Sequence, residues 1–225
     1  MKKILVVSCT TRTKEERDDL LICKSLTGLN CDVKLALHYE NKTPLPVIYN
    51  QYLTEKYKKK HDIILFVHDD VYIDDLKLRG KLYGSKDIFD IIGLAGCLYP
   101  KISAPALWHK MADRSNWRGI VNHPHEGDVN VIQSSGFGPT PSRVAILDGL
   151  FMAVNLKKVL DSGWRFNENF TFHHYDIASS LDANEKGLKL GVAPINVIHG
   201  SSGLSNYYDK SFQESQAKFL ELYSC

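Results

Sequence analysis

The 225-residue sequence lacks any apolar run that approaches the roughly 18 residues needed to cross a bilayer. The apolar run Ile4 to Val7 is too short for a secretory signal, and a charged segment follows it at once. Basic and acidic residues nearly balance, with a net charge of +2, and no basic stripe carries interleaved aromatics. We therefore expect no integral membrane segment and no nucleic-acid partner.

Paired cysteines are also absent. The five cysteines are odd in number, scattered, and never spaced as Cys-x-x-Cys, so they indicate neither a zinc site nor a disulfide framework. Reduced thiols of this kind are typical of a cytoplasmic protein, which could at most lie peripheral to a membrane. No internal repeat or low-complexity tract is present, and the length suits one sizeable core.

The most informative stretch is 63–73, in which five apolar residues run into His68, Asp69 and Asp70. A short run that is apolar on both faces is typical of a buried strand in a parallel sheet. Ligands of such sheets bind outside the carboxyl ends of the strands. Two adjacent carboxylates at that edge favour a cation or a donor-rich ligand, although a plain polar turn after the strand is the alternative.

The rest of the pattern alternates between strands and helices. We expect strands at 3–7, 31–38, 91–96, 144–154 and 190–197, and helices at 13–26, 47–60, 155–162, 172–186 and 212–223. Strand, helix and strand within the first 38 residues indicate a βαβ unit and hence a parallel sheet. Residues 99–142 are expected to be irregular, as a substrate loop or lid. The prediction is a single α/β domain with a mostly parallel, Rossmann-like sheet flanked by helices.

Further polar clusters stand at predicted element ends. Asp148 and Gly149 interrupt one strand, Asp176 opens a helix, and His199 follows the last strand. Each has an ordinary structural explanation: a tight turn, a helix-dipole partner, or a hydrogen-bonded histidine. We expect them to converge with the 68–70 cluster at one edge of one sheet, because chance convergence of all four is the weaker explanation.

The order and spacing of 66–72, 147–152, 172–176 and 197–200 resemble the GT-A glycosyltransferases, close to the inverting family-2-like group and its small glycosyltransferase-like relatives. The resemblance covers nearly the whole chain. It implies a GT-A fold over 1–225, with a nucleotide-binding half to about residue 98 and an acceptor-binding and catalytic half after it.

The resemblance implies a metal-dependent hexosyl- or deoxyhexosyltransferase, as in polysaccharide biosynthesis. The donor would be a nucleotide-sugar, with a UDP-sugar favoured, and the acceptor a hydroxyl of a glycan or glycoconjugate. In relatives a DxD-type motif holds the metal against the diphosphate. Here His68 replaces the first Asp, which leaves Asp70 as the best ligand and Asp69 as a ribose or metal contact. His199 matches a metal-binding histidine of the family, and the mixed set suits Mn²⁺ better than Mg²⁺.

The resemblance also implies where the nucleotide binds. Its expected contacts are Ser8, Thr10 and Arg12 at the exit of the first strand, Glu40 as an acceptor for a uracil ring, and Asn50. A solvated turn carboxylate is the alternative for Glu40.

Two carboxylates are candidates for the chemistry. Asp176 corresponds to the family's general base, and a helix N-terminus would tend to lower its pKa. Asp148 is the rival, or it binds the donor sugar or acceptor hydroxyls. A single displacement assisted by such a base inverts the anomeric configuration. Trp108 and Trp117 could stack on sugar rings or serve as core anchors.

Three other functions remain open. A sugar nucleotidyltransferase would use a similar sheet and metal, but its glycine-rich phosphate loop is missing from 8–14. A metal-dependent phosphohydrolase could use His68 and Asp69 as ligands, although such pairs usually lie on helices. A non-catalytic glycan-binding module would not require Asp70 or Asp176 for any activity.

Overall fold

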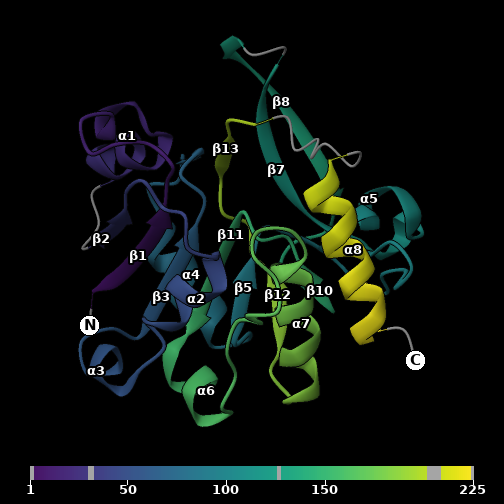
Figure 1. The fold of residues 1–225 in the computed structure, drawn as a ribbon. Coiled ribbons are helices and arrows are strands. Elements are labelled where there is room, and N and C mark those ends of the chain that lie inside the picture. Colours follow the sequence, from purple (N-terminus) through teal and green to yellow (C-terminus); the bar gives the residue numbers. More distant parts are fainter. Residues whose placement is uncertain (1–2, 30–32, 126–127, 202–208, 224–225) are drawn as a thin grey trace.

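A seven-stranded sheet lies at the centre of the protein (Figure 1), whose computed structural model describes residues 3–29, 33–125, 128–201 and 209–223. In spatial order its strands are β2 (Val33–His38), β1 (Ile4–Cys9), β3 (Ile63–Val67), β11 (Phe151–Asn155), β5 (Ile91–Gly93), β12 (Leu190–Val192) and β9 (Ser142–Arg143). Strands β1, β2, β3, β5 and β12 point the same way, whereas β11 and β9 run against them. The α/β class is confirmed, but the sheet is mixed, and β3 has a parallel neighbour on one side only.

The remaining strands form a second sheet. It contains β10 (Ile146–Leu147), β6 (Ala95–Cys97), β7 (Trp117–His125), β13 (Val197–His199) and β4 (Val71–Ile73), with β8 (Asp128–Gly138) paired to β7. The expected strand 190–197 is therefore wrong as one unit: it divides into β12 and β13, which lie in different sheets. The expected strand 144–154 likewise divides into β10 and β11 at Asp148 and Gly149.

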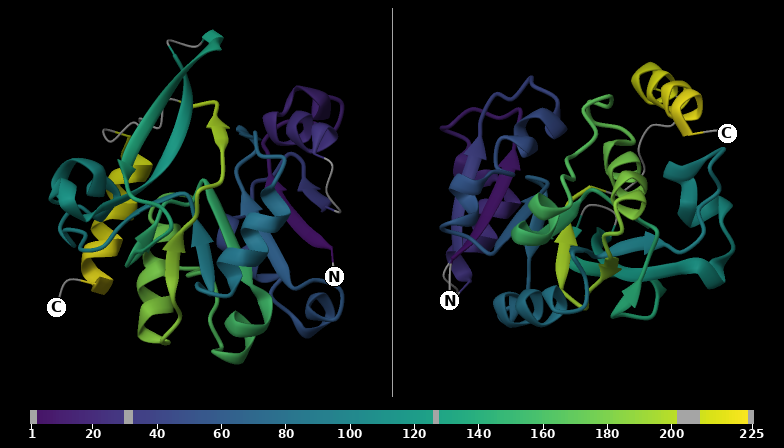
Figure 2. Two further views of the ribbon diagram at one scale, coloured as in Figure 1. Left: turned by 180° about the vertical axis from the view of Figure 1, so that it is seen from behind. Right: turned by 90° about the horizontal axis from the view of Figure 1, so that it is seen from below.

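The long hairpin of β7 and β8 corrects the expectation that 99–142 is irregular. In Figures 1 and 2 it extends away from the body of the protein as a two-stranded arm. Strand β7 contains Gly119 and Pro124, which are poor strand formers, and much of β8 is exposed. Pairing with β6 and β13 holds β7 in place, and the hydrophobic pattern of β7 alone therefore does not predict a strand.

The helices flank the two sheets. They are α1 (Leu21–Gly28), α2 (Leu45–Asn50), α3 (Glu55–Lys58), α4 (Leu78–Lys86), α5 (Trp108–Met111), α6 (Leu156–Asp161), α7 (Tyr175–Glu185) and α8 (Lys210–Tyr223), with 3₁₀ turns at Arg17–Asp19, Pro105–Leu107 and Arg114–Asn116. Helix α8 packs beside α7, where the Tyr223 hydroxyl donates a hydrogen bond of 2.6 Å to Asp182 (Figure 2). No helix among the described residues combines the length and apolar character needed to cross a bilayer.

Two expected helices are wrong in extent. Glu16 accepts a hydrogen bond of 2.9 Å from the Thr13 amide, as the capping pattern predicted, but α1 begins only at Leu21 because Leu20 is extended. The expected helix 47–60 is two short helices, since the intervening turn buries Tyr52 and Leu53 in the core.

The core surrounds β3, whose five residues are each at most 1% exposed. Phe66 contacts Tyr49 and Phe166 at ring-centroid distances of 4.6 and 4.9 Å. Phe166 in turn lies 6.1 Å from the ring of Tyr175, the first residue of α7. This packing fixes the end of β3 and the start of α7 relative to each other, and the candidate site lies between them.

Candidate functional site

A cavity of about 360 Å³ lies where the two sheets meet. Its walls include His68, Asp70, Asp148, Asp176 and His199. The structure therefore brings together the four clusters that stand at separate places in the sequence. We call this space the main cavity.

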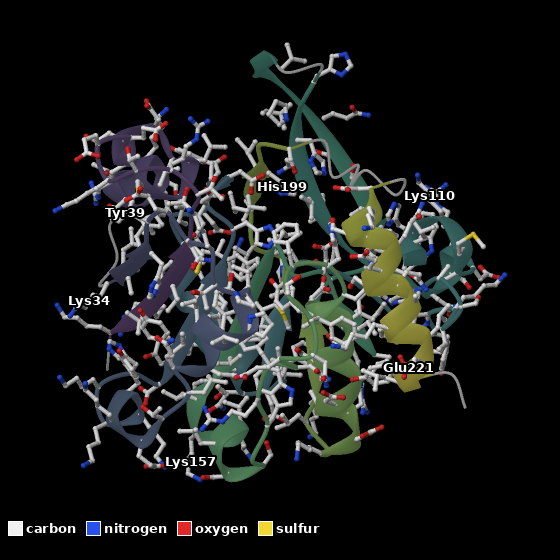
Figure 3. The ribbon with its side chains drawn as sticks, viewed as in Figure 1. Lys34, Tyr39, Lys110, Lys157, His199 and Glu221 are labelled. Atoms are coloured by element: carbon white, nitrogen blue, oxygen red, sulfur yellow. The ribbon has the colours of Figure 1, made fainter. Side chains whose placement is uncertain are left out.

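Three of these side chains form a compact group of possible metal ligands. One nitrogen or oxygen atom from each of His68, Asp70 and His199 lies within 4.8 Å of the others. His68 follows β3, Asp70 precedes β4, and His199, which is labelled in Figure 3, ends β13. His199 Nε2 lies 3.4 Å from Asp70 Oδ2, and the amide after it, on Gly200, donates a 2.7 Å hydrogen bond to the Asp70 carbonyl.

These three residues fit a divalent cation. The Nε2 atom of His68 and the Oδ1 atom of Asp70 are buried without a hydrogen-bond partner in the described part of the chain. Buried polar atoms are normally paired, so two such atoms on side chains of the same group indicate a ligand. Burial lowers the pKa of His68, which keeps its imidazole neutral. Burial alone would raise the pKa of Asp70, but His199 and His68 lower it, so the carboxylate is ionised. Neutral imidazole and carboxylate are the forms that bind metals, and since Asp70 raises the pKa of His199 against the effect of burial, a cation bound here would displace a proton from His199.

The two candidate catalytic carboxylates are joined through Gly149. Its amide donates a 2.7 Å hydrogen bond to Asp176 Oδ2, and its carbonyl accepts one of 3.0 Å from the Tyr175 hydroxyl. Asp148 accepts a hydrogen bond of 3.2 Å from the Leu150 amide. A Cβ on residue 149 would stand 2.6 Å from the Tyr175 hydroxyl and 2.9 Å from the Asp176 Cβ, so only glycine allows this approach.

The pKa of Asp176 is opposite to the expectation from the helix dipole. Burial, and then the negative charge of Asp148, raise it to about 7, and hydrogen bonds from the Ile177 and Gly149 amides only partly offset them. The helix start does supply these amide donors. Their lowering effect on the pKa is outweighed because the Asp176 carboxyl is buried beside a second carboxylate, that of Asp148.

The segment before Asp176 is held by α8. His174 precedes α7 in a left-handed conformation with φ of 63° and is 3% exposed. Its ring nitrogens lie 2.9 Å from Ser215 Oγ and 2.9 Å from Gln216 Oε1, both on α8. Ser215 also donates a 2.9 Å hydrogen bond to the carbonyl of His173. Helix α8 therefore fixes the backbone that positions Asp176.

A groove leads away from the main cavity past the exit of β1. It consists of two adjoining spaces of about 110 and 310 Å³, whose walls share Cys9, Leu45, Asp69 and Phe172. The smaller space also shares His68 and Asp70 with the main cavity, and Thr10 lines the larger one. We call this region the side groove.

Four predicted nucleotide contacts do not line the main cavity or the side groove. Ser8 is fully buried in β1, Arg12 forms an exposed ion pair with Glu16 at 2.7 Å, and Glu40 is exposed. The side chain of Asn50 donates a hydrogen bond to the Phe166 carbonyl and accepts one from the Phe166 amide, at 2.9 Å each, and so fastens a loop of the core.

The sequence analysis did not predict that Phe172 and His109 line the main cavity. Phe172 is 54% exposed, stacks on the His68 ring at 5.9 Å, and borders both the main cavity and the side groove. Phe172 lies within the motif 172–176, but nothing in the sequence indicates that its ring is exposed. Conversely, Trp108 is only 3% exposed and packs 5.0 Å from Phe137, so it serves mainly as a packing anchor.

Comparisons with known proteins bear on the family and the fold of the chain. A family model described as "Glycosyltransferase like family" matches residues 30–223, a range that contains all four clusters of the main cavity. The crystal structure of A197 from STIV is similar in fold, with a TM-score of 0.51 and 11% identity over 89% of this chain and 87% of that one. No curated protein matches the chain. At 11% identity the structural likeness shows the fold alone, which is GT-A-like. The family match spans most of the sequence, and on that ground the chain belongs to the glycosyltransferase-like family.

Proposed function

We propose that the protein is a metal-dependent glycosyltransferase that moves a sugar from a nucleotide-sugar to a hydroxyl of a glycan acceptor, with inversion. The observation that carries the proposal is the main cavity, where a metal-type trio and a carboxylate pair meet at the end of the side groove. Membership of the family supports a transferase. The scattered cysteines still favour a reducing compartment for it.

The side groove is the proposed site of the nucleotide. A diphosphate would lie beside Asp69 and Asp70, where the groove joins the main cavity, and the base would lie near Thr10 and Thr43. This arrangement places the donor sugar in the main cavity. A UDP-sugar is the first donor to test, but Glu40 no longer supports uridine over other bases, because it lies off the groove walls.

His68, Asp70 and His199 would hold the divalent cation, which supplies Lewis-acid stabilisation of the negative charge on the departing diphosphate. Two imidazoles and one carboxylate suit Mn²⁺ better than Mg²⁺, because Mg²⁺ prefers an all-oxygen shell. The buried walls around the trio strengthen this interaction, since the local dielectric is lower than that of water.

Asp176 is the proposed general base. A carboxylate whose pKa is about 7 is a stronger base than an ordinary one, yet half of it is ionised at neutral pH. The Gly149 amide orients it, and Asp148 would hold the acceptor hydroxyl beside it. The acceptor oxygen bonds to the anomeric carbon as the bond to the diphosphate oxygen breaks, and the hydroxyl proton passes to Asp176. One displacement of this kind inverts the configuration.

The first test is the thermal midpoint with UDP, GDP, CDP and ADP, each with and without Mn²⁺. Ligand at about 100 times Kd should add about 2.7 kcal/mol of stability, which is roughly 5–10 °C for a chain of this size. The shift should require Mn²⁺ and disappear in Asp70→Asn, but persist in the control Asp87→Asn, whose side chain is 78% exposed and lies outside the site.

A response to none of the diphosphates would contradict the donor assignment and favour a phosphohydrolase or a glycan-binding module. A response to triphosphates alone would favour a nucleotidyltransferase. Once a nucleotide is identified, its sugar conjugates define the donors for a transfer assay, and NMR of the product reads the anomeric configuration.

A further inference from the structure

A cavity of about 660 Å³ lies at the opposite end of the first sheet from the main cavity. It opens where β3 begins and β11 ends, beside the ends of α3 and α4 and the first turn of α6. Figure 3 shows Lys157, from its wall, near the lower edge of the molecule and well below His199. The five residues of β3 span about 17 Å between the two cavities, which share no lining residue. We call this space the basic cavity.

The walls of the basic cavity are polar and carry an excess of positive charge. All nine lining residues are polar or charged, and they include five lysines but only two aspartates. The whole chain has 28 basic and 26 acidic side chains, so the excess at this cavity is local. An apolar ligand finds no surface to pack against here, whereas an anion is attracted.

Two of the five lysines have no partner in the protein. Lys58, Lys86 and Lys157 each form an ion pair with a neighbouring carboxylate. Among the described residues, the side chains of Lys59 and Lys158 form neither an ion pair nor a hydrogen bond. Lys59 follows α3 and Lys158 lies in α6, so two separate elements bring unpaired ammonium groups to one cavity.

A buried histidine adds a second, independent sign of a ligand. His61 is 6% exposed, and its Nδ1 lies 2.8 Å from the carbonyl oxygen of Lys3. A carbonyl can only accept, so Nδ1 carries a proton and Nε2 is the nitrogen left for another partner. In the described part of the chain Nε2 has none, although His61 lines the basic cavity. Buried polar groups are normally paired, and an unengaged ring nitrogen beside a cavity therefore indicates a ligand.

These groups match the chemistry of a phosphoryl ligand. A phosphate or diphosphate carries more than one negative charge and several acceptor oxygens, and lysine binds it as a point charge. Lys59 and Lys158 can neutralise two charges at once. The Nε2 atom of His61 can accept a hydrogen bond from a P–OH group or, when protonated, donate one to a phosphate oxygen. A single carboxylate would leave one lysine without a partner, and a neutral sugar would leave both.

We propose that the basic cavity binds a multivalent phosphoryl group, with Lys59 and Lys158 as its charge partners and His61 as its hydrogen-bond partner. The group belongs either to a soluble phosphorylated molecule or to the head group of an anionic phospholipid, and the recognition chemistry is the same for both. This inference goes beyond the proposed function and does not rest on it. Binding here needs no metal ion, because the ligands are lysines and a histidine far from Asp70.

The test is calorimetric titration of the whole protein with sodium pyrophosphate, in a buffer that contains a chelator and no other phosphate or sulfate. Pyrophosphate should bind the wild type and shift the assigned imidazole C2–H resonance of His61 in NMR. Its Kd should rise about tenfold or more in the double variant Lys59→Gln/Lys158→Gln, because hydrogen bonds to charged groups contribute at least that much. The matched control is Lys34→Gln/Lys218→Gln, which removes the same charge at two exposed lysines outside the basic cavity.

Cosedimentation with vesicles distinguishes the two sources of the phosphoryl group. The vesicles contain phosphatidylcholine alone or with phosphatidylglycerol. Binding only to the vesicles with phosphatidylglycerol, lost in Lys59→Gln/Lys158→Gln, supports the site and assigns it to a lipid head group. Pyrophosphate binding without vesicle binding supports the site and assigns it to a soluble ligand. Binding of neither probe, binding that is equal in Lys59→Gln/Lys158→Gln and in the control, or an unshifted His61 resonance overturns the proposal.

Asp70→Asn separates this inference from the proposed function. Pyrophosphate binding should be unchanged in Asp70→Asn, since Asp70 does not line the basic cavity, whereas the nucleotide shift that requires Mn²⁺ should be lost. That nucleotide shift should in turn persist in Lys59→Gln/Lys158→Gln. If pyrophosphate binding is lost in Asp70→Asn and kept in Lys59→Gln/Lys158→Gln, the anion binds at the main cavity and the basic cavity is overturned as its site.

Discussion

Replacing Asp176 with asparagine should abolish transfer and, at alkaline pH, stabilise the fold. The pKa of Asp176 is raised from 3.8 to about 7 by burial and by Asp148. One pKa unit corresponds to about 1.36 kcal/mol, so ionising this group costs roughly 4 kcal/mol more in the fold than in the unfolded chain. This figure is a ceiling, because the side chain keeps a partly exposed surface through which water can relax the charge.

The sign follows from proton binding. As the pH rises from about 4 to about 7, the unfolded chain has released the proton while the folded protein still holds it. The folded state then binds more protons, so the free energy of unfolding of the wild type falls across this window. Asparagine resembles the protonated carboxyl at every pH. The two proteins should be similar near pH 4, and the variant should be more stable by about 2–4 kcal/mol near pH 8.

Urea denaturation of both proteins at about pH 4.5, 6 and 8, with a chelator present, measures this difference. Asp87→Asn is the matched control, since that side chain is 78% exposed and does not line the main cavity. A stability difference between Asp176→Asn and wild type that stays constant from acid to alkaline pH would refute the reasoning. In the same proteins, transfer should rise with pH through about 7 in the wild type and be absent in the variant.

Three further substitutions test other parts of the site. Gly149→Ala should lower the free energy of unfolding by about 1–3 kcal/mol and kcat at least tenfold, because a Cβ there displaces Asp176. Calorimetry measures the loss of stability and initial rates measure the loss of kcat, and a near-normal kcat would contradict the prediction. His174→Phe should remove the hydrogen bond to Gln216 and speed amide exchange across the first turns of α8, measured by mass spectrometry; unchanged exchange would mean that other contacts hold the helix. Asn50→Ala should destabilise the fold by about 1–3 kcal/mol in urea yet leave nucleotide affinity unchanged, and weaker nucleotide binding would restore Asn50 as a contact.

The sequence pattern predicted those parts of the site that are encoded locally. The apolar run of β3 is typical of a buried strand, and its exit carries His68 and Asp70 to the sheet edge. Asp148 and Gly149 interrupt an apolar stretch, which marked the link between β10 and β11 correctly.

Features that depend on distant neighbours were not predictable in this way. The β7–β8 hairpin is held by pairing with other strands, so its own residues carry weak strand signals. Asn50 stands in a familiar position, but its amide turns toward Phe166, which is more than 100 residues away in the chain. The pKa of Asp176 depends on Asp148 and on burial, and neither is visible from the start of a helix.

The chain crosses from one sheet to the other several times, and three of the candidate residues lie on these crossings. Between β3 and β4 the crossing carries His68 and Asp70, and between β10 and β11 it carries Asp148. Among the described residues, no strand pairing joins the two sheets. The two sheets are held together instead by a shared hydrophobic core and by backbone hydrogen bonds at these crossings, such as the one from the His68 amide to the Leu150 carbonyl. A cation bound by His68, Asp70 and His199 would join the crossing between β3 and β4 to the end of β13, so the residues proposed to hold the metal would also connect two separate parts of the chain.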